Sequence, residues 1–346
     1  MSELEAIIRQ EILTHGSISF ARFMELALYC PRIGYYERED SVLGPTGDFY
    51  TSVSVGPVFG ELLARQFAEW LDQMPTPPRT ILEAGAHDGQ LASDILTWLG
   101  EFRPDLPVEY WIVEPSERRR AWQESKLDVF AGKVTWFASL EALPPYVSGV
   151  IFSNELLDAM PVHILQWRGR WLELRVALKG DVLAWETTEL TTDLGQPEVP
   201  SGLAAVLPDG FQIETSLAAR DWWRTAATKL QRGKLVTIDY GLEQDKLLTP
   251  QRQHGTVRAY YHHHVTDGLL VRPGEQDLTA HVNFTDIQRT GEETGLKTEG
   301  VVGQSKFLTN IAATVSNWPS ERVRQFQTLT HPEHLGRAFR VLVQAK

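Results

Sequence analysis

The sequence has 346 residues, 42% hydrophobic and 23% charged, which is ordinary for a globular protein and allows one large domain or two smaller ones. Its 33 basic and 45 acidic residues give a net charge of −12, which argues against a nucleic-acid partner because phosphate backbones demand clustered lysine and arginine. The one cysteine, Cys30, excludes an internal disulfide and a zinc site built on several thiolates.

The chain begins with an amphipathic segment, residues 1–13, that carries three glutamates. A secretory signal needs a positive start and an apolar run, whereas a mitochondrial presequence is rich in arginine and poor in acids. Neither pattern is present, and no apolar run approaches the ~20 residues needed to span a bilayer. We therefore expect a cytoplasmic protein with no membrane partner.

Helices are expected over residues 3–13, 19–29 and 56–73, with a glycine-punctuated loop at 44–52 and a proline-rich linker at 75–78. Beyond the linker, strand-like runs (RTILEAG, VEYWIVEP, VTWFAS, GVIFSNEL) alternate with helix-like runs, which indicates βαβ units and a parallel sheet. Three further strand-like runs at 163–190 predict an inserted β-meander. A helix (LAARDWWRTAATKLQRG), a strand (KLVTIDYG), a helix (FTDIQRTGEETG) and two late strands complete the chain.

These elements predict an α/β fold with a doubly wound, Rossmann-like sheet. The expected divisions are an N-terminal helical cap with a cofactor-closing loop (1–75), a cofactor-binding core (76–162), a β-rich insertion (163–210), and the remaining core with C-terminal substrate-side elements (211–346).

The stretch ILEAGAHDGQL (81–91) joins the first such strand to a helix. Glu83 ends the strand, and Gly85 and Gly89 let the backbone approach a ligand at the helix N-terminus, although a tight turn without a ligand has the same pattern. Glu114 ends the next strand, 31 residues later, where a carboxylate can accept both ribose hydroxyls of an adenosine cofactor.

The loop favours S-adenosylmethionine (SAM) over NAD. A dinucleotide fingerprint has glycine where this chain has His87, and Glu83 would repel a pyrophosphate but attract the α-ammonium of a methionine moiety.

Acidic residues also follow the fourth strand, in VIFSNELLDAMP (150–161). Asn154 and Glu155 end the strand and Asp158 comes three residues later. Acids at a helix N-terminus are one explanation, because they interact favourably with the helix dipole. The other is a carboxylate pair that holds the guanidinium of an arginine beside the cofactor, fixes its plane and leaves the opposite nitrogen to attack a sulfonium methyl group.

Several stretches together resemble the MidA family of SAM-dependent methyltransferases: FMELALYCPRIGYY (23–36), GDFYTS (47–52), FGELLA (59–64), NELLDAMPV (154–162), IDYG (238–241), GTVRAYYHH (255–263) and PGEQDLTAHVNF (273–284). The resemblance implies a class I methyltransferase fold with extra elements, SAM as cofactor, and a protein arginine as acceptor. The family's mitochondrial members are associated with assembly of respiratory complex I.

The resemblance also assigns residues. Glu155 and Asp158 are expected to hold the substrate, and His281 to accept a proton or position the substrate. The expected cofactor-binding residues, including those suggested by the strand ends above, are Gly47, Asp48, Phe49, Thr51, Ser52, Glu83, Gly85, Gly89, Glu114 and Asn154.

The chain departs from the family pattern at two places. Gly85-Ala86-His87-Asp88-Gly89 replaces Gly-Pro-Gly-x-Gly, and Val53-Ser54 replaces Pro-Glu. A SAM-binding assembly factor without activity and a small-molecule methyltransferase therefore stay open. The histidines at 262–264 do not predict a metal, because consecutive side chains point in different directions. The oligomeric state cannot be predicted from these patterns.

Overall fold

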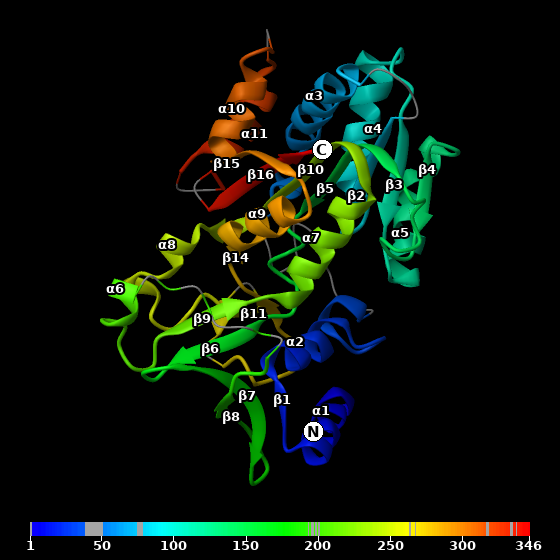
Figure 1. Cartoon of the computed structure of the whole chain (residues 1–346). Coiled ribbons are helices and arrows are strands. Elements are labelled where there is room, and N and C mark those ends of the chain that lie inside the picture. The colour runs from blue at the N-terminus through cyan, green and yellow to red at the C-terminus, as the bar shows by residue number, and fades with distance from the viewer. Residues whose placement is uncertain are drawn as a thin grey trace. The chain divides into compact units, whose positions relative to one another are not determined.

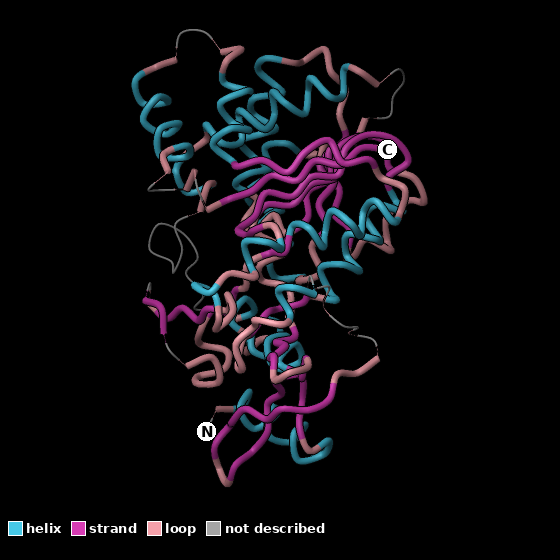
Figure 2. Tube along the Cα trace, turned by 60° about the vertical axis from the view of Figure 1, so that its left-hand side comes forward, coloured by secondary structure: helices cyan, strands magenta, loops and turns pink. Residues whose placement is uncertain are grey.

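The computed structural model describes residues 2–38, 51–74, 79–192, 194, 197, 199, 201–262, 264–266, 268–315, 318–332, 335–336 and 338–346. The chain forms two compact units, each built from separate stretches (Figures 1 and 2). Unit 1 comprises Met1–Phe49, Asp158–Arg220 and Leu242–Asn283. Unit 2 comprises Tyr50–Leu157, Asp221–Gly241 and Phe284–Lys346. The predicted linker at 75–78 lies outside the described residues.

Unit 2 contains a mixed sheet with the strand order β15-β16-β10-β5-β2-β3-β4. Its strands are β2 (Thr80–Ala84), β3 (Glu109–Val113), β4 (Val134–Phe137), β5 (Val147–Asn154), β10 (Leu230–Leu242), β15 (Lys297–Gly303) and β16 (Phe339–Ala345). The run β10-β5-β2-β3-β4 is parallel, whereas β16 is antiparallel to both of its neighbours. The prediction of a Rossmann-like sheet is confirmed.

The strand order reverses beside β2. The chain proceeds from β2 outward to β3 and β4, then returns to place β5 and β10 on the other side of β2. In open α/β sheets, ligands bind outside the carboxyl ends of the strands at this switch point. A ligand site is therefore expected at the loops after β2, β3 and β5.

Helices cover both faces of this sheet (Figure 2). The helices of unit 2 are α3 (Val58–Asp72), α4 (Gln90–Phe102), α5 (Glu117–Leu127), α9 (Phe284–Glu293), α10 (Gln304–Ala312), α11 (Ser320–Thr330) and most of α7 (Leu217–Lys229), with 3-10 turns at Val53–Val55 and Asp128–Phe130. One apolar core joins α3, α4, α10 and α11 to one face of the sheet, where Phe67 packs on Phe152. On the other face, Trp223 of α7 donates its indole N–H to Gln344 of β16 at 2.8 Å.

Unit 1 contains the predicted meander. Strands β6 (His163–Trp167), β7 (Trp171–Lys179) and β8 (Val182–Glu189) are successive and antiparallel, and β1 (Ser17–Ser19) and β9 (Gln212–Thr215) extend the sheet. A smaller sheet pairs β11 (Arg258–Tyr261) with β12 (His264–Thr266) and β13 (Asp277–Thr279). The remaining short elements are β14 (Val282–Asn283), α6 (Ser201–Ala204), α8 (Gln244–Leu247) and 3-10 turns at Tyr35–Glu37 and Pro250–Arg252.

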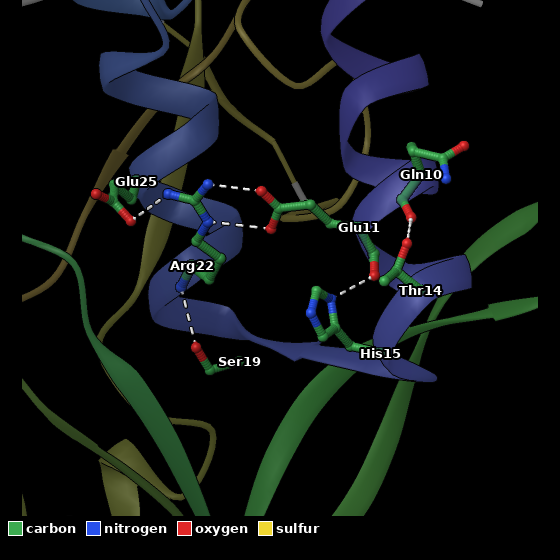
Figure 3. Close-up of polar contacts among 7 residues, drawn as sticks. All are labelled: Gln10, Glu11, Thr14, His15, Ser19, Arg22 and Glu25. Carbon is green, nitrogen blue, oxygen red and sulfur yellow. Dashed lines mark hydrogen bonds and ion pairs between the residues drawn. The ribbon is translucent and has the colours of Figure 1, made fainter.

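The two N-terminal helices of unit 1, α1 (Glu3–His15) and α2 (Phe20–Tyr29), confirm the helices expected at 3–13 and 19–29. Figure 3 shows Arg22 of α2 bonded to both carboxylate oxygens of Glu11 on α1, at 2.6 and 3.0 Å. Ser19 caps α2 by accepting the Arg22 backbone N–H. The hydrogen bonds from Arg22 lower the pKa of Glu11, so this carboxylate stays charged and holds the two helices together.

The predicted cap, residues 1–75, does not form one body. Residues 2–38 fold in unit 1, whereas α3 belongs to unit 2. The reason is the apolar face of α3, which is buried against the sheet through Phe59, Leu63 and Phe67. Among the described residues, no helix is both long and apolar enough to cross a membrane.

Candidate active site

In the loop after β2, every second residue from Gly85 to Gly89 has a left-handed backbone conformation. Gly85, His87 and Gly89 have φ angles of 76°, 49° and 85°. Such alternation makes a concave row of backbone N–H groups that suits an anionic or polar ligand. A side chain at Gly85 would meet Leu156 at 3.0 Å, so this position needs glycine for space as well as for its backbone angle. The two predicted glycines are therefore required by the shape of the loop.

His87 is held in this loop by both its main chain and its ring. Its carbonyl accepts a hydrogen bond from Gln123 at 2.9 Å, and its Nδ1 lies 3.5 Å from Asp88 Oδ1. Its Nε2 is buried without a partner. Burial alone would raise the pKa of Asp88, but hydrogen bonds from His87 and Lys126 hold it well below its usual range. His87, which stands where the family pattern has glycine, is therefore accommodated in the loop with its carbonyl and its ring both in contact with neighbours.

Glu83, at the carboxyl end of β2, is 2% exposed and accepts the hydroxyl hydrogen of Tyr110 at 2.6 Å. Burial raises the pKa of its carboxyl group to about 8. The group is therefore mostly protonated at neutral pH. Its predicted attraction to an ammonium group stays a prediction, and it requires that the ligand's positive charge lower this pKa.

Glu114 follows β3 and is 1% exposed. Its Oε1 accepts the Ser116 backbone N–H at 2.9 Å and lies 3.2 Å from Arg119 Nε, and its Oε2 accepts Gln123 Nε2 at 3.1 Å. A carboxylate offers about four acceptor sites, so these two hydrogen bonds and one ion-pair contact leave capacity for a hydroxyl of a ribose.

Gln123 of α5 joins the two loops and was not predicted. Its Nε2 donates both to the His87 carbonyl and to Glu114, and its Oε1 accepts Trp136 Nε1 at 3.0 Å. Gln123 and Leu127 are the buried residues of α5 and lie four residues apart, on one face of the helix. A polar residue on the inward face of this helix was the signal in the sequence.

Asn154 and Glu155 come together at the end of β5. Glu155 Oε1 accepts hydrogen bonds from Asn154 Nδ2 at 3.0 Å and from the Ser52 backbone N–H at 3.3 Å. Ser52 is fully buried and donates its hydroxyl hydrogen to Gln304, while Thr51 pairs with Ser54 in the turn that precedes α3. The structure thus brings Ser52, Asn154 and Glu155 to one edge of the sheet.

Asp239 shapes the same loop and had no predicted role. It lies near the carboxyl end of β10 and is fully buried. Its Oδ2 accepts the backbone N–H groups of Leu156 and Leu157 at 3.2 and 2.8 Å. The stretch IDYG contained this acid, but its partners lie more than eighty residues earlier in the chain.

Asp158 and His281 lie in unit 1, where the Asp158 carbonyl accepts the Ala280 backbone N–H at 2.9 Å. Burial and the charges of Arg252 and Arg258 lower the pKa of His281 to about 4, and its Nδ1 is buried without a partner. Glu155 belongs to unit 2, so the pairing of Glu155 with Asp158 stays a prediction. Gly47, Asp48, Phe49 and His263 lie outside the described residues.

A profile of a family of S-adenosyl-L-methionine-dependent methyltransferases matches residues 62–302 of the chain. The chain belongs to this family. The resemblance to MidA proteins is thereby confirmed, and the methyltransferase is SAM-dependent.

Known structures and curated proteins agree with this assignment. A COG1565 superfamily member from Burkholderia thailandensis, solved with bound S-adenosyl-homocysteine, is 32% identical with a TM-score of 0.85, over 99% of this chain and 92% of that chain. The mitochondrial protein arginine methyltransferase NDUFAF7 homolog of Drosophila melanogaster is 28% identical over 97% of this chain and 83% of its own length. The corresponding human protein is 27% identical over 95% and 80%.

The expectation of a cytoplasmic protein is corrected by these relatives, because those from fly, human and zebrafish are all named as mitochondrial. That expectation rested on residues 1–13. In the structure this segment is a folded helix whose Leu4, Ile8 and Ile12 are buried in the core of unit 1. The acidic and apolar residues of this segment serve the packing of a folded helix, so their pattern does not indicate the cellular compartment of the protein.

The residues of unit 2 fit the cofactor of the family. Glu114 has acceptor capacity for a ribose hydroxyl, and the positive φ angles of Gly85, His87 and Gly89 shape the loop at 85–89 so that its backbone can approach a ligand. When bound, SAM supplies a methyl group carried on a positively charged sulfur. Within the described residues, no group of three or more histidine, cysteine or acidic side chains could hold a metal ion.

Proposed function

We propose that this methyltransferase transfers the methyl group of SAM to a guanidinium nitrogen of an arginine in a protein substrate. The observation that carries the proposal is the fixed carboxylate of Glu155, bonded to Ser52 and Asn154 at the switch point of the sheet. The curated relatives named as protein arginine methyltransferases support it.

Glu155 would bind and orient the acceptor. An arginine stays protonated at neutral pH, and its planar group of N–H donors matches a carboxylate. Two hydrogen bonds fix the plane of the guanidinium and draw its positive charge toward Glu155, so that a nitrogen on the far side is left as the nucleophile. A carbon–nitrogen bond then forms as the carbon–sulfur bond breaks, and the nitrogen loses one proton.

The proton would leave to a carboxylate or to His281. A histidine with a pKa of about 4 is neutral at neutral pH and is about as basic as an ordinary carboxylate, so either group can take the proton. Glu155 is the candidate for this transfer in unit 2, and the roles of Asp158 and His281, which belong to unit 1, stay predictions from the sequence. The mitochondrial members of the family that the sequence resembles are associated with assembly of respiratory complex I, so an acceptor related to a respiratory complex is one candidate.

The experiment incubates the purified full chain and SAM carrying a labelled methyl group with a lysate of cells that lack the gene. Mass spectrometry then locates the label. We expect labelled arginine, and a loss of about 100-fold in rate for Glu155→Gln with SAM affinity retained, because a charge that acts in the transition state is removed. The matched control is Glu124→Gln, an exposed acid on α5.

Label on another residue type or on a small molecule would replace the arginine assignment. A Glu155→Gln protein that methylates arginine at the wild-type rate would remove Glu155 from the site. Absence of any label, together with unchanged cell growth for Glu155→Gln, would favour a SAM-binding assembly factor without activity, the alternative suggested by His87.

A further inference from the structure

We infer that the side-chain carbonyl of Asn154 accepts an N–H of the acceptor guanidinium, next to the Glu155 carboxylate. This inference rests on the proposed function and adds a substrate-binding residue to it. Asn154 is 9% exposed, and its Oδ1 is buried with no hydrogen-bond partner.

The orientation of the amide follows from its neighbour. A carboxylate only accepts hydrogen bonds, so the Asn154 nitrogen must face Glu155 Oε1, which lies 3.0 Å away. The oxygen of the same planar amide therefore points away from that carboxylate oxygen. The adjacent buried residue, Ser153, has its hydroxyl satisfied by Thr237 at 3.0 Å. Of these two adjacent described residues, Asn154 carries the buried acceptor without a partner, which costs free energy until a donor binds.

The backbone holds this unfavourable arrangement in place. Glu155 has a φ of 51°, which is uncommon for a residue other than glycine. Its N–H donates to the Ile238 carbonyl at 2.9 Å, and Asp239 fixes the next two N–H groups. Strained residues that the surrounding structure maintains cluster at functional sites. The frame fixes the positions of both acceptors before the substrate binds.

The chemistry of the two acceptors selects the ligand. An amide oxygen beside a carboxylate requires a group with several N–H donors in fixed directions. A guanidinium has five such donors in one plane. An ammonium group, as on the cofactor, is a compact charge whose three donors rotate freely, so it does not require acceptors in one plane. A planar cation matches this pair of acceptors best.

The experiment compares Asn154→Ala and Asn154→Asp. The substrate is a peptide spanning the arginine that the labelling experiment identifies, and steady-state kinetics on it are paired with calorimetry using S-adenosyl-homocysteine. Removal of the acceptor in Asn154→Ala should raise the peptide KM about tenfold. The affinity for S-adenosyl-homocysteine should stay within about twofold. Asn154→Asp keeps an oxygen acceptor but cannot donate a hydrogen bond to Glu155. Its peptide KM should lie close to the wild-type value.

The two variants separate substrate binding from support of Glu155. If Asn154 only orients Glu155, the Asp variant will be as impaired as the Ala variant, which overturns the inference. Gln344→Ala is the matched control: it removes a buried amide with its partners satisfied, and should change the unfolding temperature but not KM.

A tenfold loss of S-adenosyl-homocysteine affinity with an unchanged peptide KM would assign Asn154 to the cofactor and overturn the inference alone. A wild-type chain that methylates no arginine overturns the proposed function, and with it this inference.

Discussion

Glu83 illustrates how an environment changes the chemistry of a residue. In the sequence it is an acid at the end of a strand, and an anion is the natural expectation. In the structure its carboxyl group is enclosed between strands and bonded to Tyr110, so desolvation favours the neutral form. Burial raises its pKa more than the hydrogen bond from Tyr110 lowers it, so its charge is set by tertiary packing and is not encoded locally.

This burial predicts a pH-dependent stability. The pKa of Glu83 rises from 4.5 to about 8, so the folded chain binds this proton more tightly than the unfolded chain. The resulting stabilisation is fully present below pH 4.5 and is lost as the pH rises through 8. Wild type should therefore lose at least about 2 kcal/mol of unfolding free energy between pH 6 and pH 9 relative to Glu83→Gln. Urea unfolding at both pH values measures the difference.

Glutamine preserves the shape of Glu83 and can still accept the Tyr110 hydrogen, so the comparison isolates ionisation. Glu109→Gln, an exposed acid at the start of β3, provides the control and should follow wild type. Parallel pH profiles for wild type and Glu83→Gln would show that Glu83 ionises freely in the folded chain.

Several of the site residues predicted from the sequence share one property: they end a strand or start the loop after it. The carboxyl ends of parallel strands meet at one edge of a sheet, so Glu83, Glu114 and Asn154 could be grouped without coordinates. Gln123 and Asp239 were missed, because their roles depend on tertiary contacts with loops distant in the chain. The hidden acceptor on Asn154 likewise needs atomic positions.

At the scale of elements, the alternation of strand and helix predicted β2, β3, β4 and β5 correctly, since each unit is local in sequence. The position of β16 could not be predicted. It lies between β15 and β10, although the chain places it last. Strand order is decided by which edges remain to be paired, and the periodicity of β16 does not contain that information.

The sheet also depends on close approaches that only glycine permits. A Cβ at Gly149 of β5 would lie 1.8 Å from the Thr80 carbonyl oxygen on the neighbouring strand. Because this neighbour is backbone, it cannot move without separating β5 from β2. We expect Gly149→Ala to destabilise the chain by about 3 kcal/mol or more, measured by thermal and urea unfolding.

The control is Gly100→Ala in α4, where a Cβ would meet nothing within 4 Å. Alanine is the better helix former by roughly 1 kcal/mol, so this variant should be as stable as wild type or more so. Similar destabilisation by both substitutions would contradict the argument from backbone contact.

At the scale of the whole molecule, the fold class was predictable and the divisions of the chain were not. Each unit is assembled from three separate stretches, and the chain leaves unit 2 directly after Glu155-Leu156-Leu157. Sequence patterns mark changes of element type, such as the start of the meander at residue 163. They do not mark which surfaces pack together, which is why the predicted cap separates into parts of two units.

The placement of the cofactor residues predicts where ligand binding will protect the chain. The described residues that fit SAM, in the loops after β2 and β3, all belong to unit 2. Hydrogen exchange of the full chain with saturating S-adenosyl-homocysteine should therefore slow most at residues 84–90 and 114–123. At a ligand concentration one hundred times the dissociation constant, the stabilisation is about 2.7 kcal/mol.

Glu114→Gln should weaken binding about tenfold and reduce this protection, since it replaces a charged acceptor of the ribose by a neutral amide. Glu109→Gln, at the other end of the same strand, should retain it. Protection that survives Glu114→Gln at full strength would mean that the sugar binds elsewhere, because the carboxylate that follows β3 would then contribute nothing to holding it.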